Sequence, residues 1–244
     1  MRDLFPKQDQ LQATMFGGRF HANKPVVGGR DPRGAAASAL FYWSHAYATG
    51  ACEFGLHPHE GFEIMTFVLA GENAHYDTAT AKWTPLVKGD FQVIRSGSGL
   101  SHAERIAEGT RAFQIWFDPD LKQSLREPPG YEDHSPRDVP SVAKGDVTTT
   151  EYVGGRSGVR AATEGLSIRK IAFASAGAYT LRLAAGQRYS VYVLAGSCRL
   201  GGRAAATDDM MNAAGGDLRI EHEAGCELFV IELPLAPSYA PVAR

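Results

Sequence analysis

Short apolar runs, each followed by a turn, make up most of the chain. The clearest are residues 62–69 and 111–117, in which β-branched and aromatic side chains are frequent. Similar runs at residues 91–94, 179–183, 189–194 and 226–233 have the length and composition of strands. Glycine (27 residues) and proline (13 residues) separate them, and long segments with a helical period are scarce. The pattern therefore predicts an all-β protein.

Two short segments of the first half of the chain recur in the second half. The segment VLAG at residues 68–71 returns at residues 193–196, and the Gly-Asp pair at residues 89–90 returns at residues 216–217. The two offsets, 125 and 127 positions, nearly agree. We interpret the chain as a duplicated β-domain, although short strand-turn segments also recur by chance in all-β proteins.

The stretch between the two copies has the composition of a linker. Residues 118–140 contain five prolines among charged residues and at most one helical turn, at residues 121–126. We therefore expect an N-terminal domain of residues 1–135 and a C-terminal domain of residues 136–244.

Composition narrows the classes of protein further. Basic and acidic residues number 25 and 27, so a net charge of −2 gives no electrostatic footprint for nucleic acid. The three cysteines, Cys52, Cys198 and Cys226, are typical neither of a disulfide framework nor of a thiolate zinc site. No window approaches about 18 consecutive apolar residues, and the first residues lack the apolar stretch of a secretory signal. We expect a cytoplasmic protein that binds neither nucleic acid nor a membrane.

Two pairs of polar residues have the spacing of metal ligands on strands. Because side chains two positions apart share a face of a strand, His57 lies beside His59, and His102 lies beside Glu104. If the two strands lie close together inside a barrel, three imidazoles and one carboxylate converge on one point. Imidazole suits first-row metals, and one carboxylate offsets part of the charge of a divalent ion. The pattern predicts a mononuclear metal site built from these four residues.

The four ligands leave two kinds of site open. An octahedral ion would keep open positions for a substrate or dioxygen, whereas a tetrahedral zinc ion could be satisfied by the four ligands and serve only the fold. Glu63 is a further candidate carboxylate, either as a ligand or as a hydrogen-bond partner of one. The remaining histidines, among them His75, show no pattern that predicts a function.

The residues of the predicted site resemble those of the pirins. Residues 57–63, HPHEGFE, resemble the HPHRGFE segment of that family, and residues 97–104, GSGLSHAE, resemble its A-G-x-G-x-x-H-x-E segment. Residues 89–92 and 113–116 look like its Gly-Asp-x-Gln turn and its next core strand. The resemblance covers residues 55–120 well, and the internal repeat extends it to the second half.

The resemblance implies a bicupin, which consists of two tandem jelly-roll barrels, with one iron-type site in the N-terminal barrel. The family's three histidines and one glutamate correspond to His57, His59, His102 and Glu104. Fe(II) is the expected ion, and the ligand set also accepts manganese, cobalt, nickel, copper or zinc. The C-terminal barrel is expected to be degenerate and metal-free, because arginine and alanine stand 125 positions after the first two histidines.

Two activities follow from the same resemblance. Some bacterial pirins are similar to quercetin 2,3-dioxygenases, which predicts a metal-dependent oxidoreductase that opens a flavonol or related polyphenol with O2, with Glu104 as the catalytic residue. Mammalian pirins look like redox-sensitive transcription cofactors, so a non-enzymatic regulator with a protein partner is one alternative, and an inert scaffold with a structural metal is another. Glu60 stands where the family usually has arginine, which places a negative charge beside the site and disfavours an anionic flavonol.

Overall fold

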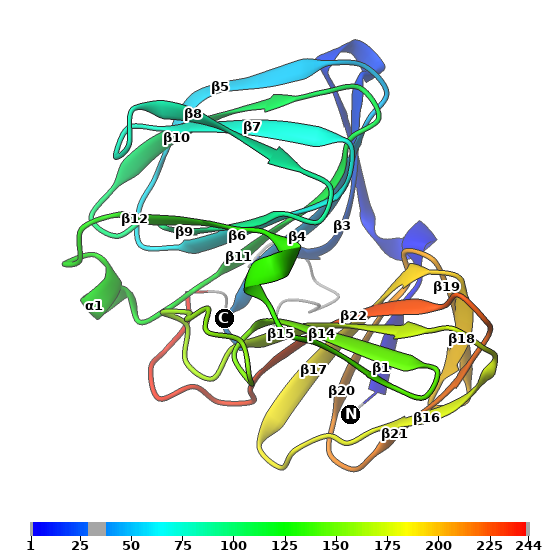
Figure 1. Cartoon of the computed structure of the whole chain (residues 1–244). Helices are drawn as coiled ribbons and strands as arrows, with labels where there is room; N and C mark the ends of the chain where they lie inside the picture. Colours follow the sequence, from blue (N-terminus) through cyan, green and yellow to red (C-terminus); the bar gives the residue numbers. More distant parts are fainter. Residues whose placement is uncertain (1, 29–37, 243–244) are drawn as a thin grey trace. The chain divides into compact units, whose positions relative to one another are not determined.

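The computed structural model describes residues 2–28 and 38–242, which form two compact units (Figure 1). The N-terminal unit consists of Leu11–Arg137 and the segment that follows Ser238, and the C-terminal unit consists of Asp138–Ser238 and the segment that ends at Gln10. Each unit therefore includes a terminal segment from the other half of the sequence. No helix in the described part of the chain has the length and apolar character needed to cross a membrane.

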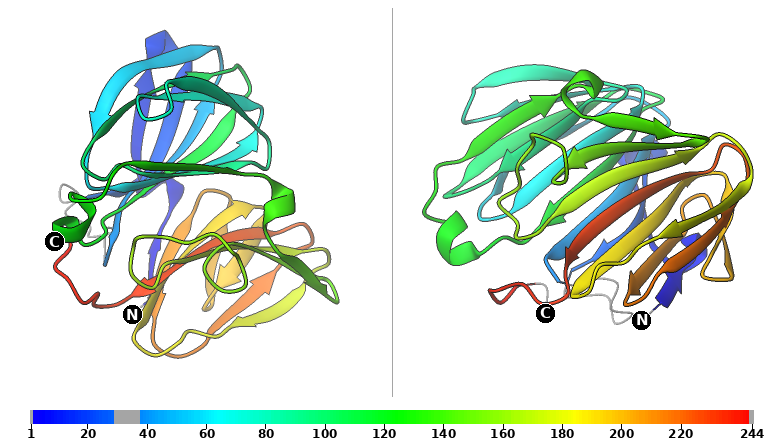
Figure 2. Two further views of the ribbon diagram at one scale, coloured as in Figure 1. Left: turned by 60° about the vertical axis from the view of Figure 1, so that its left-hand side comes forward. Right: turned by 60° about the horizontal axis from the view of Figure 1, so that its bottom comes forward.

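Two antiparallel sheets face one another in the N-terminal unit (Figure 1, Figure 2). The first sheet has the strand order β12 (Gly130–His134), β9 (Phe91–Arg95), β6 (Glu63–Ala70), β11 (Arg111–Phe117), β4 (Leu40–Ala48), β3 (Phe20–Val27) and β2 (Leu11–Met15). The second sheet has the order β5 (Cys52–His59), β10 (Leu100–Ile106), β7 (Glu72–Asp77) and β8 (Lys82–Val87). Within the described residues, the connections contain only the short helices η2 (Phe16–Gly18), α1 (Leu121–Ser124) and η3 (Pro136–Asp138). The prediction of an all-β fold is confirmed.

The side chains of β11 alternate between the face that carries the candidate site and the opposite face. Phe113, Ile115 and Phe117 are completely buried on one face of the strand. The residues between them, Gln114 and Trp116, therefore point to the opposite face. That face carries the polar groups of the candidate site.

Part of the predicted linker is a strand. β12 pairs with β9, and on it the Tyr131 hydroxyl accepts a hydrogen bond from Gln92 Nε2 (2.8 Å) and donates one to Asp133 Oδ2 (2.7 Å). The interpretation of residues 118–140 as a linker was therefore wrong for residues 130–134. The prolines of the stretch flank this strand at residues 128, 129 and 136, outside its hydrogen-bonded ladder. The predicted helical turn is present as α1.

The C-terminal unit has the same two-sheet arrangement. Its larger sheet has the order β1 (Arg2–Phe5), β20 (Met210–Ala214), β17 (Gln187–Ala195), β22 (Glu227–Pro234), β15 (Ser167–Phe173), β14 (Val147–Val153) and β13 (Ser141–Lys144). Its smaller sheet has the order β16 (Gly177–Leu181), β21 (Leu218–His222), β18 (Ser197–Leu200) and β19 (Arg203–Ala206), and η1 (Lys7–Asp9) follows β1. The interior is filled by a large cluster of buried apolar side chains, among them Leu200, Leu218 and Ile220.

The hydrogen bonds of one turn demonstrate the duplication and correct one of the two predicted equivalences. Gly89 N donates to Val68 O (2.8 Å), and Asp208 N donates to Val193 O (2.8 Å) in the same position of the other unit. The repeat of residues 68–71 at residues 193–196 is thereby confirmed. The equivalence of Gly89 with Gly216 was wrong, because Gly216 precedes β21, whereas Asp208 precedes β20, the neighbour of β17. Asp208 takes the positive φ of that turn (77°), as Gly89 does (95°).

Candidate metal centre

The pairing of β5 with β10 brings three of the predicted ligands together. His57 lies opposite His102 in the antiparallel register, and His59 lies opposite Leu100. Each of the three histidines offers a ring nitrogen, and these atoms all lie within 4.8 Å of one another. His102 is buried, whereas His57 and His59 are half-buried. Two paired strands, on which every second side chain shares a face, thus suffice to place three imidazoles around one point.

The distances between the three rings fit a metal ion better than a hydrogen-bonded cluster. His102 Nε2 lies 2.9 Å from His57 Nε2 and 3.0 Å from His59 Nε2. A ring nitrogen carries either one proton or one lone pair, so His102 Nε2 cannot satisfy both contacts as hydrogen bonds. Two nitrogens bound at about 2.1 Å lie about 3.0 Å apart at a 90° angle and about 3.4 Å apart in a tetrahedron. The spacing of the ring nitrogens therefore fits three ligands of one divalent ion.

The protonation of the imidazoles suits metal binding. Burial, together with a smaller contribution from the neighbouring histidines, lowers the pKa of His59 to about 4 and that of His102 to about 2. These rings are therefore neutral near pH 7, which is the form that binds a metal. His57 Nδ1 lies 2.8 Å from the carbonyl oxygen of Gly55, and donation to this oxygen leaves the Nε2 lone pair free to bind the ion.

Glu104, the fourth predicted ligand, lies beside the histidines but not among the three converging atoms. Its side chain is 6% exposed, and both of its oxygens accept from Gln114 Nε2, at 3.1 and 3.3 Å. Burial raises the pKa of this carboxyl, while the hydrogen bond from Gln114 and the nearby His57 lower it. The β5–β10 register shifts between His102 and Glu104, so these two residues do not follow one regular strand face. Glu104 as a metal ligand stays a prediction.

A chain of contacts links Glu104 to His59 through β11. Gln114 donates to Glu104 and accepts through its Oε1 from Trp116 Nε1 (3.3 Å). The Trp116 ring meets that of His59 edge to face, with 4.9 Å between the centroids. Trp116 and Gln114 therefore fix the orientation of the carboxylate and of one imidazole together.

A third pair with ligand-like spacing, His75 and Asp77 on β7, was not predicted from the sequence. His75 lies opposite Glu104 in the β7–β10 register, and its ring centroid is 5.1 Å from that of His102 and 5.1 Å from that of Tyr131. His75 Nε2 lies 3.6 Å from Asp77 Oδ2, and both side chains are completely buried. Burial lowers the pKa of His75 to about 4, although Asp77 acts in the opposite direction. The rule that paired His57 with His59 applies equally to residues 75 and 77 and could have identified them.

The two other acidic residues near the predicted site, Glu63 and Glu60, lie in different environments. Glu63 is completely buried and forms an ion pair with Arg95 (3.5 Å), its cross-strand partner on β9. Glu60 is exposed and lines an open groove beside His59. Glu63 therefore has a structural partner, and Glu60 places a negative charge at one approach to the histidines.

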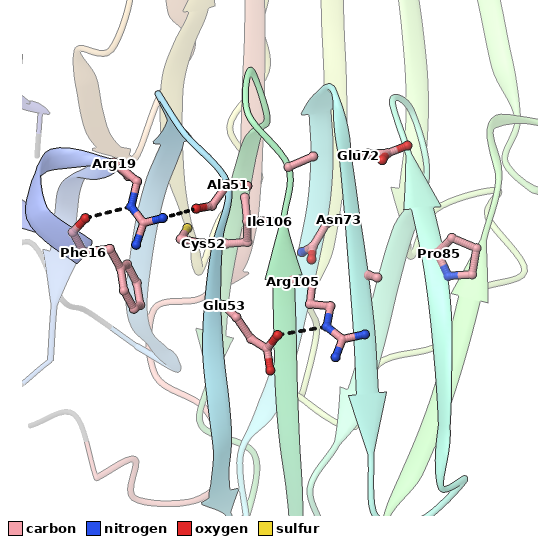
Figure 3. A pocket seen from close by; sticks show the side chains of 12 residues that line it. Phe16, Arg19, Ala51, Cys52, Glu53, Glu72, Asn73, Pro85, Arg105 and Ile106 are labelled. Atoms are coloured by element: carbon pink, nitrogen blue, oxygen red, sulfur yellow. Dashed lines mark hydrogen bonds and ion pairs between the residues drawn. The ribbon is translucent and has the colours of Figure 1, made fainter.

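A partly enclosed cavity of about 150 Å³ extends inside the barrel from His57 and Glu104 to Phe20 and Met15. A larger, open hollow of about 730 Å³ lies at the opposite end of the β5–β10 pair, where Ile106 faces Cys52 (Figure 3). Ile106 and Asn73 line both the cavity and the hollow. Two charged groups of the hollow form an ion pair with each other, since Arg105 Nε lies 2.9 Å from Glu53 Oε2.

The predicted resemblance to pirins is confirmed by comparison with known proteins. Residues 35–117 match the model of the Pirin family. The chain is 40% identical over 91 residues to a pirin-like protein of Caulobacter vibrioides, a match that spans 36% of this chain and 39% of that one. It is 29% identical over 207 residues to a proposed quercetin 2,3-dioxygenase of Pseudomonas aeruginosa, covering 78% of this chain and 71% of the relative.

The likeness in fold extends over both units. A bacterial pirin of Escherichia coli, solved in complex with nickel(II), superimposes with a TM-score of 0.81 and covers 96% of this chain and 99% of its own, at 22% identity. The two-barrel, bicupin fold is therefore shared even where the sequences have diverged.

Proposed function

Because residues 35–117 carry a pirin domain, we propose that the protein is a metal-dependent dioxygenase that acts on a polyphenol. The observation that supports this most is the convergence of three imidazoles beside a cavity inside the barrel. A relative named as a proposed quercetin 2,3-dioxygenase supports the choice of substrate class. We assign the metal to the N-terminal unit, since the interior of the C-terminal unit is packed with apolar side chains.

His57, His59 and His102 would hold the ion, with Glu104 as the fourth ligand. Glu104 follows His102 by two residues and lines the same cavity as His57. Fe(II) is our first choice, and manganese, cobalt, nickel, copper or zinc suit the same donors. A redox-active divalent ion bound there supplies the binding and activation of dioxygen and a Lewis acid for a substrate oxygen.

The protein's own groups bind and orient the substrate. Glu104 is placed to accept a proton at its carboxylate oxygen from a substrate hydroxyl in the cavity, and Gln114 holds that carboxylate in position. The apolar walls, which include Phe20 and Phe54, reduce the access of water to the substrate. The proposed location is the cytoplasm, which suits three buried cysteines that are all unpaired.

The test combines metal analysis with oxygen consumption. Purified protein is stripped, reloaded anaerobically with Fe(II) and assayed on an oxygen electrode with quercetin and with single-ring diols. We expect His59→Ala to lose both stoichiometric iron and oxygen uptake, because it removes one of three converging ligands. The control His21→Ala alters a histidine on β3 that bonds Thr14 at 3.3 Å, and it should retain both. Stoichiometric metal without oxygen uptake from any polyphenol would refute the dioxygenase and favour a regulator or a structural zinc site.

A further inference from the structure

The cavity beside His57 is small. Its volume of about 150 Å³ equals that of engineered cavities that bind a single benzene ring, whereas pockets for drug-sized ligands usually measure about 300–1,000 Å³. A flavonol consists of two fused rings and a third attached ring. The volume of the cavity therefore matches one ring of this size better than a whole flavonol.

The walls of the cavity suit an aromatic ring that carries oxygen atoms. Phe20, Tyr42 and Phe54 supply aromatic surface. Ser44 and Thr66 supply hydroxyl groups among these rings. Such a mixture of apolar walls and a few polar groups is typical of a small-molecule site.

Lys24 adds a positive charge to this cavity. Its ammonium group lies 5.4 Å from the centroid of the Tyr42 ring, and both side chains line the cavity and are half-buried. No carboxylate of the described residues forms an ion pair with Lys24. A half-buried ammonium without a counter-ion attracts an anionic ligand oxygen.

The open groove on the other side of the histidines has the opposite charge. It is lined by Pro58, His59 and Glu60, and the carboxylate of Glu60 is exposed there. A phenolate would be repelled by Glu60 in the groove and attracted by Lys24 in the cavity. The cavity also contains the carboxylate of Glu104, so Lys24 is the group that offsets negative charge there and favours an anionic substrate oxygen on its own side of the cavity.

We propose that the substrate of this centre is a single-ring aromatic diol, bound in this cavity as its monoanion with Lys24 beside the anionic oxygen. This inference rests on the proposed function, because it takes the cavity next to the histidines as the substrate pocket. It replaces the three-ring flavonol by a ring of catechol size, and it makes Lys24 the residue that selects for negative charge.

The experiment measures binding without turnover. Nickel(II)-loaded protein is titrated under anaerobic conditions with 1,2-dihydroxybenzene and with quercetin in a calorimeter. We expect the single-ring diol to bind with 1:1 stoichiometry and at least about 10-fold more tightly than quercetin. Lys24→Met should weaken diol binding by about 10-fold or more, as the loss of a charge-assisted hydrogen bond predicts. The control Lys82→Met removes an exposed lysine that does not line the cavity and should leave the affinity unchanged.

The outcomes separate this inference from the proposed function. Quercetin binding as tight as diol binding, or unchanged diol affinity in folded Lys24→Met, would overturn the inference. The dioxygenase could still stand in that case, if the iron-loaded protein consumed oxygen with quercetin. Diol binding that depends on Lys24 without oxygen uptake in the iron-loaded protein would support the inference and refute the dioxygenase.

Discussion

The role of Gln114 gives the sharpest test of the centre, because this amide holds Glu104 without being a metal ligand itself. Gln114→Leu keeps nearly the same shape and removes the donor that contacts both oxygens of Glu104 at 3.1 and 3.3 Å. A hydrogen bond to a charged group contributes about 1.5–3 kcal/mol, which corresponds to roughly 10- to 150-fold in an equilibrium constant. Loss of a residue that orients a metal ligand typically costs about 10- to 100-fold in metal affinity. We therefore expect Gln114→Leu to weaken metal binding by about 10- to 100-fold.

Competition with a chromophoric chelator measures this change directly. Wild type, Gln114→Leu and the control Gln8→Leu, which alters an exposed glutamine, are titrated with nickel(II) at pH 7.5, and far-UV circular dichroism verifies folding. Glu104→Gln is measured in parallel and should lose at least as much affinity as Gln114→Leu. A metal Kd within threefold of wild type in both folded variants would show that Glu104 is not a ligand and that its hydrogen bond with Gln114 serves only the core.

Two further predictions concern stability, each measured by urea unfolding. Arg95→Met should destabilise the protein by roughly 3 kcal/mol, because it removes the ion pair of the completely buried Glu63 carboxylate. The control Arg105→Met removes an exposed ion pair and should cost at most about 1 kcal/mol. Equal losses of stability in the two variants would contradict the argument. Gly71→Ala should cost more than about 2 kcal/mol, since φ is +72° and the new Cβ would lie 2.7 Å from backbone. Gly109→Ala, with φ +82° and open space, should lose only the conformational part of about 1 kcal/mol, so a loss as large as that of Gly71→Ala would contradict the role of the clash.

Local patterns predicted the strands and the histidine cluster because both depend on the period of two along a strand. The apolar alternation of β11 and the His-x-His spacing on β5 can be read from a few neighbouring residues. β12 was missed for a related reason. Its side chains are mostly polar, and two of them, Tyr131 and Asp133, form hydrogen bonds with buried Gln92. Prolines on both sides gave the segment the composition of a linker.

Other features depend on which strands become neighbours, which a single sequence does not reveal. His75 and Asp77 have ligand-like spacing, but their place beside His102 and Glu104 follows from the pairing of β7 with β10. The turn at Asp208 escaped notice because aspartate replaces the glycine found at residue 89 and still takes a positive φ. The size of the cavity results from side chains of several strands, so it could not be inferred from any one segment.

The distribution of buried polar groups between the two barrels argues for where function lies. Both units share one strand order and one turn geometry, but among the described residues the C-terminal unit buries only one imidazole, that of His222, and one carboxylate, that of Asp208. The C-terminal barrel fills its interior with apolar side chains, which gain stability from burial at no cost in desolvation. The N-terminal barrel instead buries His75, Asp77, His102 and Glu104, groups whose desolvation costs free energy unless partners compensate. Several of the buried imidazoles and carboxylates of the N-terminal unit thus lie beside the predicted metal ligands, which supports the proposal of a metal centre there.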